Sequence, residues 1–325
     1  MEVKLVAFES MGVRSMCTYI RTPDVSILID PSAACHSRSG IPPHPLEYEM
    51  LIRKRGEMAS LSRDADVIAI SHYHLDHLSP QETDLRTTFS TRAFVDEVFA
   101  GKVLLCKDPD SNVTERQGIR GKRFRRLYSR RAPEYHVADG GNFNFGQTEV
   151  AFSEPLWHGR EGTVQGFVVG TCVRDGGMTV VHASDVQLLN RRCVEWMVEQ
   201  EPDLAITAGP PLFDPDRMMN GEWGIASGLL KELSSGVPKV VVDHHPLRSP
   251  DWRKFLGGVP GVGCAAEVEG VPVLTLESGR RSLYEGEEIE AGFHQQLAEG
   301  RVPNRLRSVI LEEGLGRIYK GPLKW

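Results

Sequence analysis

Four short runs of apolar, largely β-branched residues each stop abruptly at a polar or turn-forming stretch. Runs of this length between such breaks are typical of buried strands. They are DVIAI (66–70), MTVV (178–181), DLAIT (203–207) and KVVV (239–242). Helical stretches at 188–200 and 224–235 separate the later three runs. The pattern predicts a layered α/β fold in which functional side chains gather at the carboxyl ends of strands.

Earlier segments of the chain favour strands and hairpins. Segments 25–31, 148–159 and 166–173 are each predicted to form one strand. The sequence RDGG at 174–177 is a tight-turn sequence that should join the last of these to the run at 178–181. We therefore expect a mixed α/β protein whose strands pack under helices.

One predicted strand end carries an unusual density of metal-binding side chains. The stretch SHYHLDH contains His72, His74, Asp76 and His77. In an extended loop the first two histidines point to the same side, and the other two residues can turn to a neighbouring point as the chain curls. The sequence SPQE at 79–82 has the form of a capping box, which predicts that a helix begins there. This geometry suits two adjacent metal ions better than one, and solvent-exposed histidines are the alternative.

Single histidines and aspartates stand at other predicted strand ends. They are His158, Asp185 and either His244 or His245. Each alone is weak evidence, because an isolated histidine is more often a surface or packing residue than a ligand. Imidazole and carboxylate together suit zinc, iron or manganese, and zinc is the expected metal of a histidine-rich site.

The complete series resembles the ligand set of the metallo-β-lactamase superfamily. The series is His72-x-His74-x-Asp76-His77, then His158, then Asp185, then a terminal histidine. The stretches MGVRSMCTYI, IPPHPLE, ASDVQ and DHHPLR are similar to a largely archaeal branch of predicted metal-dependent hydrolases. The resemblance covers most of the chain. It implies an αββα sandwich, in which two mixed sheets lie face to face with helices outside and strand-end loops build the site at one edge.

The resemblance also implies two zinc ions per chain, with manganese or iron as alternatives. The residues that would hold the first ion are His72, His74 and His158; those for the second are Asp76, His77 and the terminal histidine; and Asp185 would bridge the two. A water between the ions would lose a proton near neutral pH and attack a carbonyl carbon or phosphorus. Asp76 and Asp185 are then the catalytic aspartates, because they hold this nucleophile as well as the metals.

The choice of terminal histidine stays open between His244 and His245. Both follow the predicted strand 239–242, in which neighbouring side chains point to opposite faces, so only one of them is expected to face the metals. The run from His244 to Arg248 resembles the end of the ligand series in tRNA-processing relatives, which favours His244.

Three further residues are candidates for contact with the substrate: Arg14, His44 and Arg248. Arg14 follows the first predicted strand, and a structural ion pair is an equally supported alternative for it. His44 lies in a proline-rich loop, where it either lines the substrate mouth or simply packs. His182, inside a predicted strand, is expected to be a core histidine.

A basic stretch, RQGIRGKRFRRLYSRR at 116–131, contains eight Lys and Arg and no acid. It either binds a phosphate-bearing substrate or forms a solvated insertion or a subunit contact. The net charge of −6 gives no general case for nucleic acid or an anionic membrane as a partner.

We expect one domain over residues 1–325, with a basic insertion at 108–136 and a C-terminal extension at 280–325. The six scattered cysteines form no CxxC pair and are expected to be buried thiols. The amino terminus lacks the apolar core of a signal peptide, and no apolar run approaches the ~20 residues that span a bilayer. A cytoplasmic protein is therefore expected, and its oligomeric state stays open.

These observations combine into a dinuclear metallo-hydrolase that cleaves a phosphoester or an ester/lactone bond in a small, anionic substrate. The first alternative is a metal-dependent nuclease acting on RNA or DNA. The further alternatives are an iron-dependent oxidase or dioxygenase and a non-catalytic metal-binding module.

Overall fold

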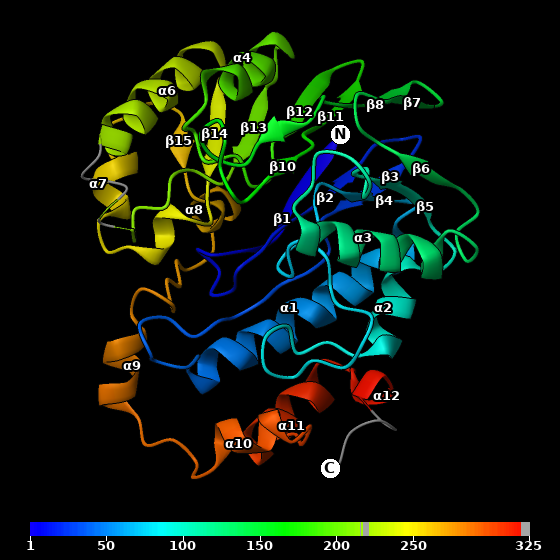
Figure 1. Ribbon diagram of the computed structural model, residues 1–325. Coiled ribbons are helices and arrows are strands. Elements are labelled where there is room, and N and C mark those ends of the chain that lie inside the picture. Colours follow the sequence, from blue (N-terminus) through cyan, green and yellow to red (C-terminus); the bar gives the residue numbers. More distant parts are fainter. Residues whose placement is uncertain (215, 217–220, 320–325) are drawn as a thin grey trace.

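The computed structural model describes residues 1–214, 216 and 221–319. Two mixed β-sheets lie face to face and carry helices on their outer surfaces (Figure 1). This architecture is the αββα sandwich that the resemblance to the metallo-β-lactamase superfamily implies. Among the described helices, none is long and apolar enough to cross a bilayer.

The first sheet has six strands in the order β1-β2-β3-β4-β5-β6. They are β1 (Glu2–Phe8), β2 (Met16–Arg21), β3 (Ser26–Ile29), β4 (Val67–Ile70), β5 (Val103–Cys106) and β6 (Tyr135–Val137). The first three run antiparallel, and β3 to β6 run parallel. The strands predicted at 25–31 and 66–70 are confirmed as β3 and β4.

The second sheet has seven strands in the order β15-β14-β13-β12-β11-β8-β7. They are β7 (Asn142–Phe145), β8 (Thr148–Phe152), β11 (Thr171–Asp175), β12 (Met178–His182), β13 (Leu204–Thr207), β14 (Lys239–Val242) and β15 (Val262–Gly263). The predicted apolar runs are β12, β13 and β14. These strands are parallel neighbours, so their carboxyl ends meet at one edge of the sheet. The predicted tight turn between β11 and β12 is confirmed.

Helices cover the outer face of each sheet (Figure 1). Over the first sheet lie α1 (Pro45–Asp64), α2 (Arg92–Phe99) and α3 (Glu115–Tyr128). Beyond α1 and α2, on the side away from the sheet, lie α9 (Arg280–Gly286), α10 (Phe293–Ala298), α11 (Asn304–Glu312) and α12 (Gly316–Tyr319) from the end of the chain. With the second sheet lie α4 (Arg191–Glu199), α6 (Trp223–Gly236), α7 (Trp252–Leu256) and α8 (Ala265–Glu269). The helices predicted at 188–200 and 224–235 are confirmed as α4 and α6.

Two apolar cores hold the layers together. One lies between the sheets and extends to α4 and α6, and the other lies between the first sheet and the helices that cover it. All six cysteines are buried free thiols, as predicted. His182 in β12 is buried and donates to the carbonyl of Met16 at 2.8 Å, which confirms it as a core histidine.

Two predicted strands are each divided in the structure. The segment 148–159 forms β8 and then β9 (Leu156–Trp157), separated at Pro155, which has no N–H to give to a ladder. The segment 166–173 forms β10 (Phe167–Val168) and then β11. Between these two strands the ring of Trp196 fills the space that a Cβ on Gly170 would need, at 2.4 Å.

The helix start predicted at 79–82 is wrong. These residues form turns and irregular chain, and the next helix, α2, begins only after an N-cap at Thr91. The hydroxyl of Ser79, expected to cap a helix, instead accepts from the buried guanidinium of Arg55 at 3.0 Å.

A true capping box opens α1, the long helix that the sequence patterns did not predict. His44 is its N-cap and accepts from the backbone N–H of Leu46, while the side chain of Glu47 accepts from the N–H of His44 at 2.7 Å. Pro45 occupies the first helical position, where its missing N–H costs nothing. The proline-rich stretch around His44 is therefore a helix start.

Candidate metal centre

Strands from both sheets deliver polar residues to one point. The loop carrying His72 to His77 follows β4, His158 follows β9, Asp185 follows β12, and the pair His244–His245 follows β14. Each of these segments lies just beyond a carboxyl strand end, as the sequence predicts. All of these histidines and aspartates are buried except His74 and Asp76, which are partly exposed.

The carboxylate of Asp185 is the hub of this cluster. The distances from its Oδ2 are 2.6 Å to His158 Nε2, 3.5 Å to His72 Nε2, 3.7 Å to His77 Nε2 and 3.8 Å to His74 Nδ1. Its Oδ1 lies 3.3 Å from His245 Nε2 and 3.6 Å from His244 Nε2. One carboxylate thus faces six imidazoles that arrive from three other segments of the chain.

Ligand atoms of the cluster fall into overlapping groups, each of which could hold a metal ion. Within 4.8 Å of one another lie one ligand atom each from His72, His74, His158 and Asp185, and likewise from Asp76, His77 and His244. A third such group contains Asp185, His244 and His245. Asp76 Oδ2 lies 3.3 Å from His244 Nε2. The arrangement has the donor set of a zinc, manganese or iron site, because it offers only imidazole nitrogens and carboxylate oxygens.

Tautomers at two of the histidines show that a cation fits here. His77 Nδ1 lies 2.9 Å from the carboxylate of Asp30, and His245 Nδ1 lies 3.1 Å from the carbonyl of Gly209. Both oxygens can only accept hydrogen bonds, so each Nδ1 carries a proton. In a neutral ring, Nε2 then has no proton, and its lone pair points toward Asp185. His77 Nε2 and Asp185 Oδ1 are buried without a hydrogen-bond partner in the described chain. Acceptors that face one another in this way need a positive charge between them.

The pKa values agree with this interpretation. Burial lowers the pKa of His72 to about 3 and that of His244 to about 4, which leaves both rings neutral, the form that binds metal. Burial opposes a charge on His77, but its hydrogen bond to Asp30 raises the pKa to about 9. A positive charge at this ring, whether proton or metal, is therefore favoured. Burial would raise the pKa of Asp185, but the surrounding imidazoles, His158 foremost, hold it well below its usual value.

Outer partners hold the remaining rings in place. Ser71 Oγ lies 2.9 Å from His72 Nδ1, and the amide of Gln187 lies 3.2 Å from His158 Nδ1. The amide of Gln117, on α3, lies 3.2 Å from the outer nitrogen of His74. Such contacts orient metal ligands and fix their tautomers.

The residues that hold the ligand rings from outside, Asp30 and Gln117 among them, are not among the candidates that the sequence pattern indicates. Asp30 directly follows β3, so the rule that pointed to strand ends could have found it. It binds the backbone N–H of Ser71 at 2.8 Å and accepts from the hydroxyl of Ser184, also at 2.8 Å. Gln117 lies inside the basic stretch and no sequence signal marks it.

The backbone is strained at three residues of the centre. Asp30, Ser184 and His244 have positive φ values of 49°, 51° and 122°. A non-glycine residue in such a conformation costs about 1–3 kcal/mol and persists only where the surroundings enforce it. Strain of this kind clusters at functional sites, which supports the assignment of a metal centre.

The expectation that only one of His244 and His245 faces the centre is wrong. Both lie beyond the last residue of β14, where the alternation of a strand no longer applies. His244 has a φ of 122° and His245 has helical angles of −64° and −46°, so the chain turns and brings both Nε2 atoms to Asp185.

Arg248 lies against His244. Its Nη2 is 2.8 Å from Nε2 and 3.1 Å from Nδ1 of that ring. An atom nearly equidistant from both nitrogens cannot lie along either lone pair, because the two diverge. Nε2 of His244 also lies 3.3 Å from Asp76 and 3.6 Å from Asp185, so it faces both carboxylates.

Alanine variants of the two histidines should differ in metal content. His244 belongs to the group with Asp76 and His77, so His244→Ala is expected to reduce bound metal from about two ions to one. His245→Ala should keep both ions but lower the affinity for the second by roughly tenfold, as loss of a residue that supports a ligand does. Metal analysis and chelator competition measure this. Loss of an ion only in His245→Ala would make His245 the terminal ligand.

The three candidate substrate residues lie in different settings. Arg14 donates to the carboxylate of Glu277 at 2.6 Å, and Arg38 donates to the same carboxylate. Arg14 therefore forms the structural ion pair that was the alternative to substrate contact. His44 caps α1, lies 3.5 Å from Glu287 and packs edge-on against the ring of Tyr284. Arg248, besides contacting His244, donates to Glu9 at 2.9 Å, and its guanidinium is 4.0 Å from Asp76, beside the centre. Contact of any of them with substrate stays a prediction.

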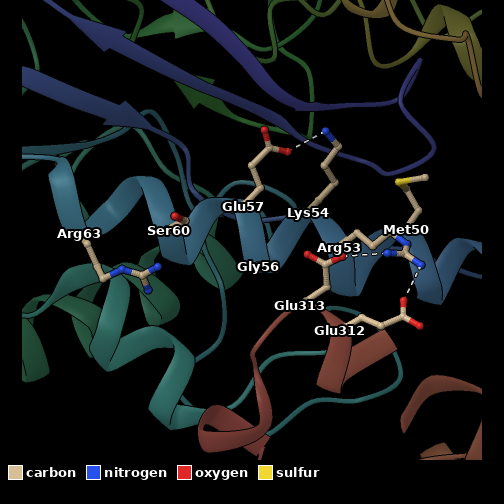
Figure 2. A pocket seen from close by; sticks show the side chains of 9 residues that line it. All are labelled: Met50, Arg53, Lys54, Gly56, Glu57, Ser60, Arg63, Glu312 and Glu313. Carbon is tan, nitrogen blue, oxygen red and sulfur yellow. Dashed lines mark hydrogen bonds and ion pairs between the residues drawn. The ribbon is translucent and has the colours of Figure 1, made fainter. Parts of the chain in front are cut away.

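A separate groove of about 580 Å³ lies between α1 and α11 (Figure 2). Its charged side chains pair with one another: Arg53 with Glu312 at 3.1 Å and with Glu313 at 2.9 Å, and Lys54 with Glu57 at 3.0 Å. None of the histidine cluster lines it. These paired side chains give no indication that the groove is an active site.

Comparison with known proteins identifies the family. No family model matches the chain. The UPF0282 protein of Thermococcus onnurineus is 37% identical over 304 residues, which cover 91% of this chain and 98% of that protein. The chain belongs to the UPF0282 family. A second UPF0282 protein, from Methanopyrus kandleri, is 37% identical over 295 residues, covering 89% of this chain and 100% of that protein. The resemblance to an archaeal branch is thus confirmed.

Solved structures similar to this UPF0282 chain include the metallo-beta-lactamase fold protein YhfI from Bacillus subtilis. It is 16% identical with a TM-score of 0.46, and the match covers 81% of this chain and 96% of that one. Another is a metal-dependent hydrolase of the beta-lactamase superfamily, 11% identical with a TM-score of 0.45, covering 81% and 94%. These TM-scores are low, and the fold of the present chain rests on its own two sheets.

Proposed function

We propose that this UPF0282 chain is a metal-dependent hydrolase that holds two ions, zinc first among the candidates, and cleaves an ester-type bond in a small, anionic substrate. The observation that carries the proposal is the carboxylate of Asp185 facing six imidazoles, with the lone pairs of His77 and His245 aimed at it. A buried arrangement of that kind is stable only around positive charge.

Each half of the cluster would hold one ion. The first half is His72, His74 and His158, the second is Asp76, His77 and His244, and Asp185 lies between the halves. Ions bound there would supply an acidified water and would stabilise the negative charge that develops during hydrolysis. Asp76 and Asp185 would orient the attacking water, because their carboxylates accept hydrogen bonds at the meeting point of the two halves.

The centre opens to solvent on one side. The side chain of His74 is 28% exposed and that of Asp76 is 15% exposed, whereas those of His72, His77 and His244 are fully buried. A substrate would therefore approach past His74 and Asp76. Burial on all other sides excludes competing water and strengthens the electrostatic interactions within.

A nucleic-acid substrate is the less favoured alternative. Much of the charge on the basic stretch is paired within the chain: Lys122 and Arg125 with Asp110 at 3.3 Å and 2.7 Å, and Arg123 with Glu82 at 2.8 Å. Side chains held in this way are less available to track a phosphate backbone.

Purified protein should contain about two metal ions per chain, mostly zinc, because seven liganding positions exceed the four of one tetrahedral ion. Removing the ions with a chelator should lower the melting temperature, since ligands that bind only the folded chain stabilise it. Elemental analysis and thermal melts with and without added metal measure both effects. A folded preparation that takes up no metal would contradict the proposal.

Phosphodiester, lactone and thioester substrates would test the chemistry. Turnover of a phosphoester or a lactone should appear with metal and vanish with chelator. Metal binding without turnover of any of these classes would leave a metal-binding protein that is not an ester hydrolase.

A further inference from the structure

A cavity of about 290 Å³ lies between α3 and the chain that follows the metal-binding histidines. Its apolar wall consists of Leu75, Leu78, Pro80 and Ile119. Leu75 stands in the sequence directly between two of the candidate ligands, so the cavity adjoins the centre. Ile119 is 61% exposed, which is unusual for a large aliphatic side chain and leaves apolar surface for a ligand to cover.

Arg120 supplies a positive charge to this cavity. Its guanidinium donates to the carbonyl of Tyr73 at 3.1 Å, and no other acceptor for it lies within the part of the chain that the structure describes. A guanidinium has five N–H donors, so most of its hydrogen-bonding capacity is unused. Burial lowers the pKa of Arg120, whereas the charge of Asp76 acts in the opposite direction, which places Arg120 within electrostatic reach of the centre.

The acidic residues of the same cavity have hydrogen-bond partners other than Arg120. Glu82 pairs with Arg123 at 2.8 Å. Asp84 accepts from the backbone N–H groups of three following residues at 3.0–3.1 Å. Neither carboxylate binds Arg120, so its guanidinium keeps free N–H donors for an anion.

Helix α3 links the cavity to the metal centre. Gln117, one turn before Arg120, contacts His74 with its side-chain amide. Gly121 lets the helix lie close to this loop, because a Cβ there would come within 2.5 Å of the ring of Tyr73. The helix thus presents Gln117 to the centre and Arg120 to the cavity beside it.

We infer that this cavity binds the part of the substrate remote from the bond that is cleaved. An apolar body lies against Leu75, Leu78 and Ile119, and an anionic group, phosphate or carboxylate, lies on Arg120. The inference rests on the proposed function for the statement that the occupant is the substrate.

Calorimetric titration of the full-length, as-purified protein tests the cavity. The probes are 1-naphthyl phosphate, 1-naphthoate, uncharged 1-naphthol and inorganic phosphate. An aromatic anion should bind more tightly than either the uncharged ring or the bare anion, because only it contacts both the apolar wall and Arg120. Comparison of the naphthyl phosphate with the naphthoate decides which anion the cavity prefers.

Variants separate this site from the metals. Arg120→Gln should weaken binding of the aromatic anion by roughly tenfold, the effect of one hydrogen bond to a charged group. Ile119→Glu should weaken it at least as much by placing a negative charge in the cavity, and an exposed side chain there leaves folding intact. Lys122→Gln, which makes the same charge change on the same helix at a residue paired to Asp110, should bind like the wild type.

Metal content is measured for each variant, so that a loss of anion affinity caused by loss of metal can be recognised. Equal affinity in wild type, Arg120→Gln and Ile119→Glu, or no binding of any aromatic anion, would overturn the inference. Binding that depends on Arg120 in a protein without metal or hydrolysis would overturn the proposed function and keep the cavity. Hydrolysis with metal but with no effect of either variant on anion affinity would overturn the cavity alone.

Discussion

Asp185→Asn is expected to empty the metal centre and to lower the rate of hydrolysis by more than about a hundredfold. Loss of a residue that only supports a metal ligand typically costs 10–100-fold in affinity or activity, and Asp185 touches the ligands directly. Its carboxylate lies within 3.8 Å of six imidazoles. An amide removes the negative charge that both halves share and can turn N–H groups toward lone pairs that a metal should occupy. Elemental analysis should find less than one ion per chain.

Asp203→Asn is the matched control. Asp203 precedes β13 at the end of the sheet opposite the centre, where its carboxylate accepts from the backbone N–H of Thr179 at 2.8 Å. The amide oxygen of asparagine can keep that bond, so metal content and rate should remain those of the wild type. Two ions bound to Asp185→Asn with wild-type affinity would show that Asp185 is not a ligand.

Arg55→Met should destabilise the folded chain by about 2–5 kcal/mol, because each buried acceptor left without its donor costs about 1–3 kcal/mol. Arg55 lies in α1, is fully buried and donates to Ser79 Oγ at 3.0 Å, to the carbonyl of Ala33 at 2.9 Å and to the carbonyl of Thr88. Methionine fills a similar volume but removes the donor to the carbonyls of Ala33 and Thr88, whereas Ser79 keeps its contact with Ser32. Denaturant unfolding monitored by circular dichroism measures the loss.

Arg53→Met, two residues earlier on the same helix, provides the comparison. The side chain of Arg53 is 44% exposed and pairs with Glu312 and Glu313. Exposed pairs contribute about 0–1 kcal/mol, so this variant should stay close to wild-type stability. A similar cost for both variants would mean that the network around Arg55 adds nothing beyond the helix itself.

The strand ends could be predicted from the sequence, and so could the convergence of the candidate ligands, because both depend on local patterns. β4, β12, β13 and β14 are short apolar runs that end at polar residues, and buried parallel strands have that pattern. Since the carboxyl ends of such strands meet at one edge, the candidate ligands had to converge. The residues that hold the ligands from outside come from separate segments, and only the folded chain brings them together.

The helix start predicted from the capping pattern was wrong because the same residues can form hydrogen bonds with other segments of the chain. SPQE at 79–82 has the form of a helix start, but Ser79 is used by Arg55 from another segment. The true box at the start of α1 has histidine as its N-cap, a residue outside the usual set of Ser, Thr, Asp and Asn. His44 was therefore assigned to a loop. The twofold alternation that separated His244 from His245 failed because the strand ends before them.

The residues of the candidate centre run from His72 to His245 along the chain and come from both sheets. No fragment that stops short of β14 contains the complete set. In the proposed two-ion centre, a growing chain must therefore form strands of both sheets before it can hold either ion. Metal binding would then be a late step of folding, and bound metal would indicate that the two sheets have packed together.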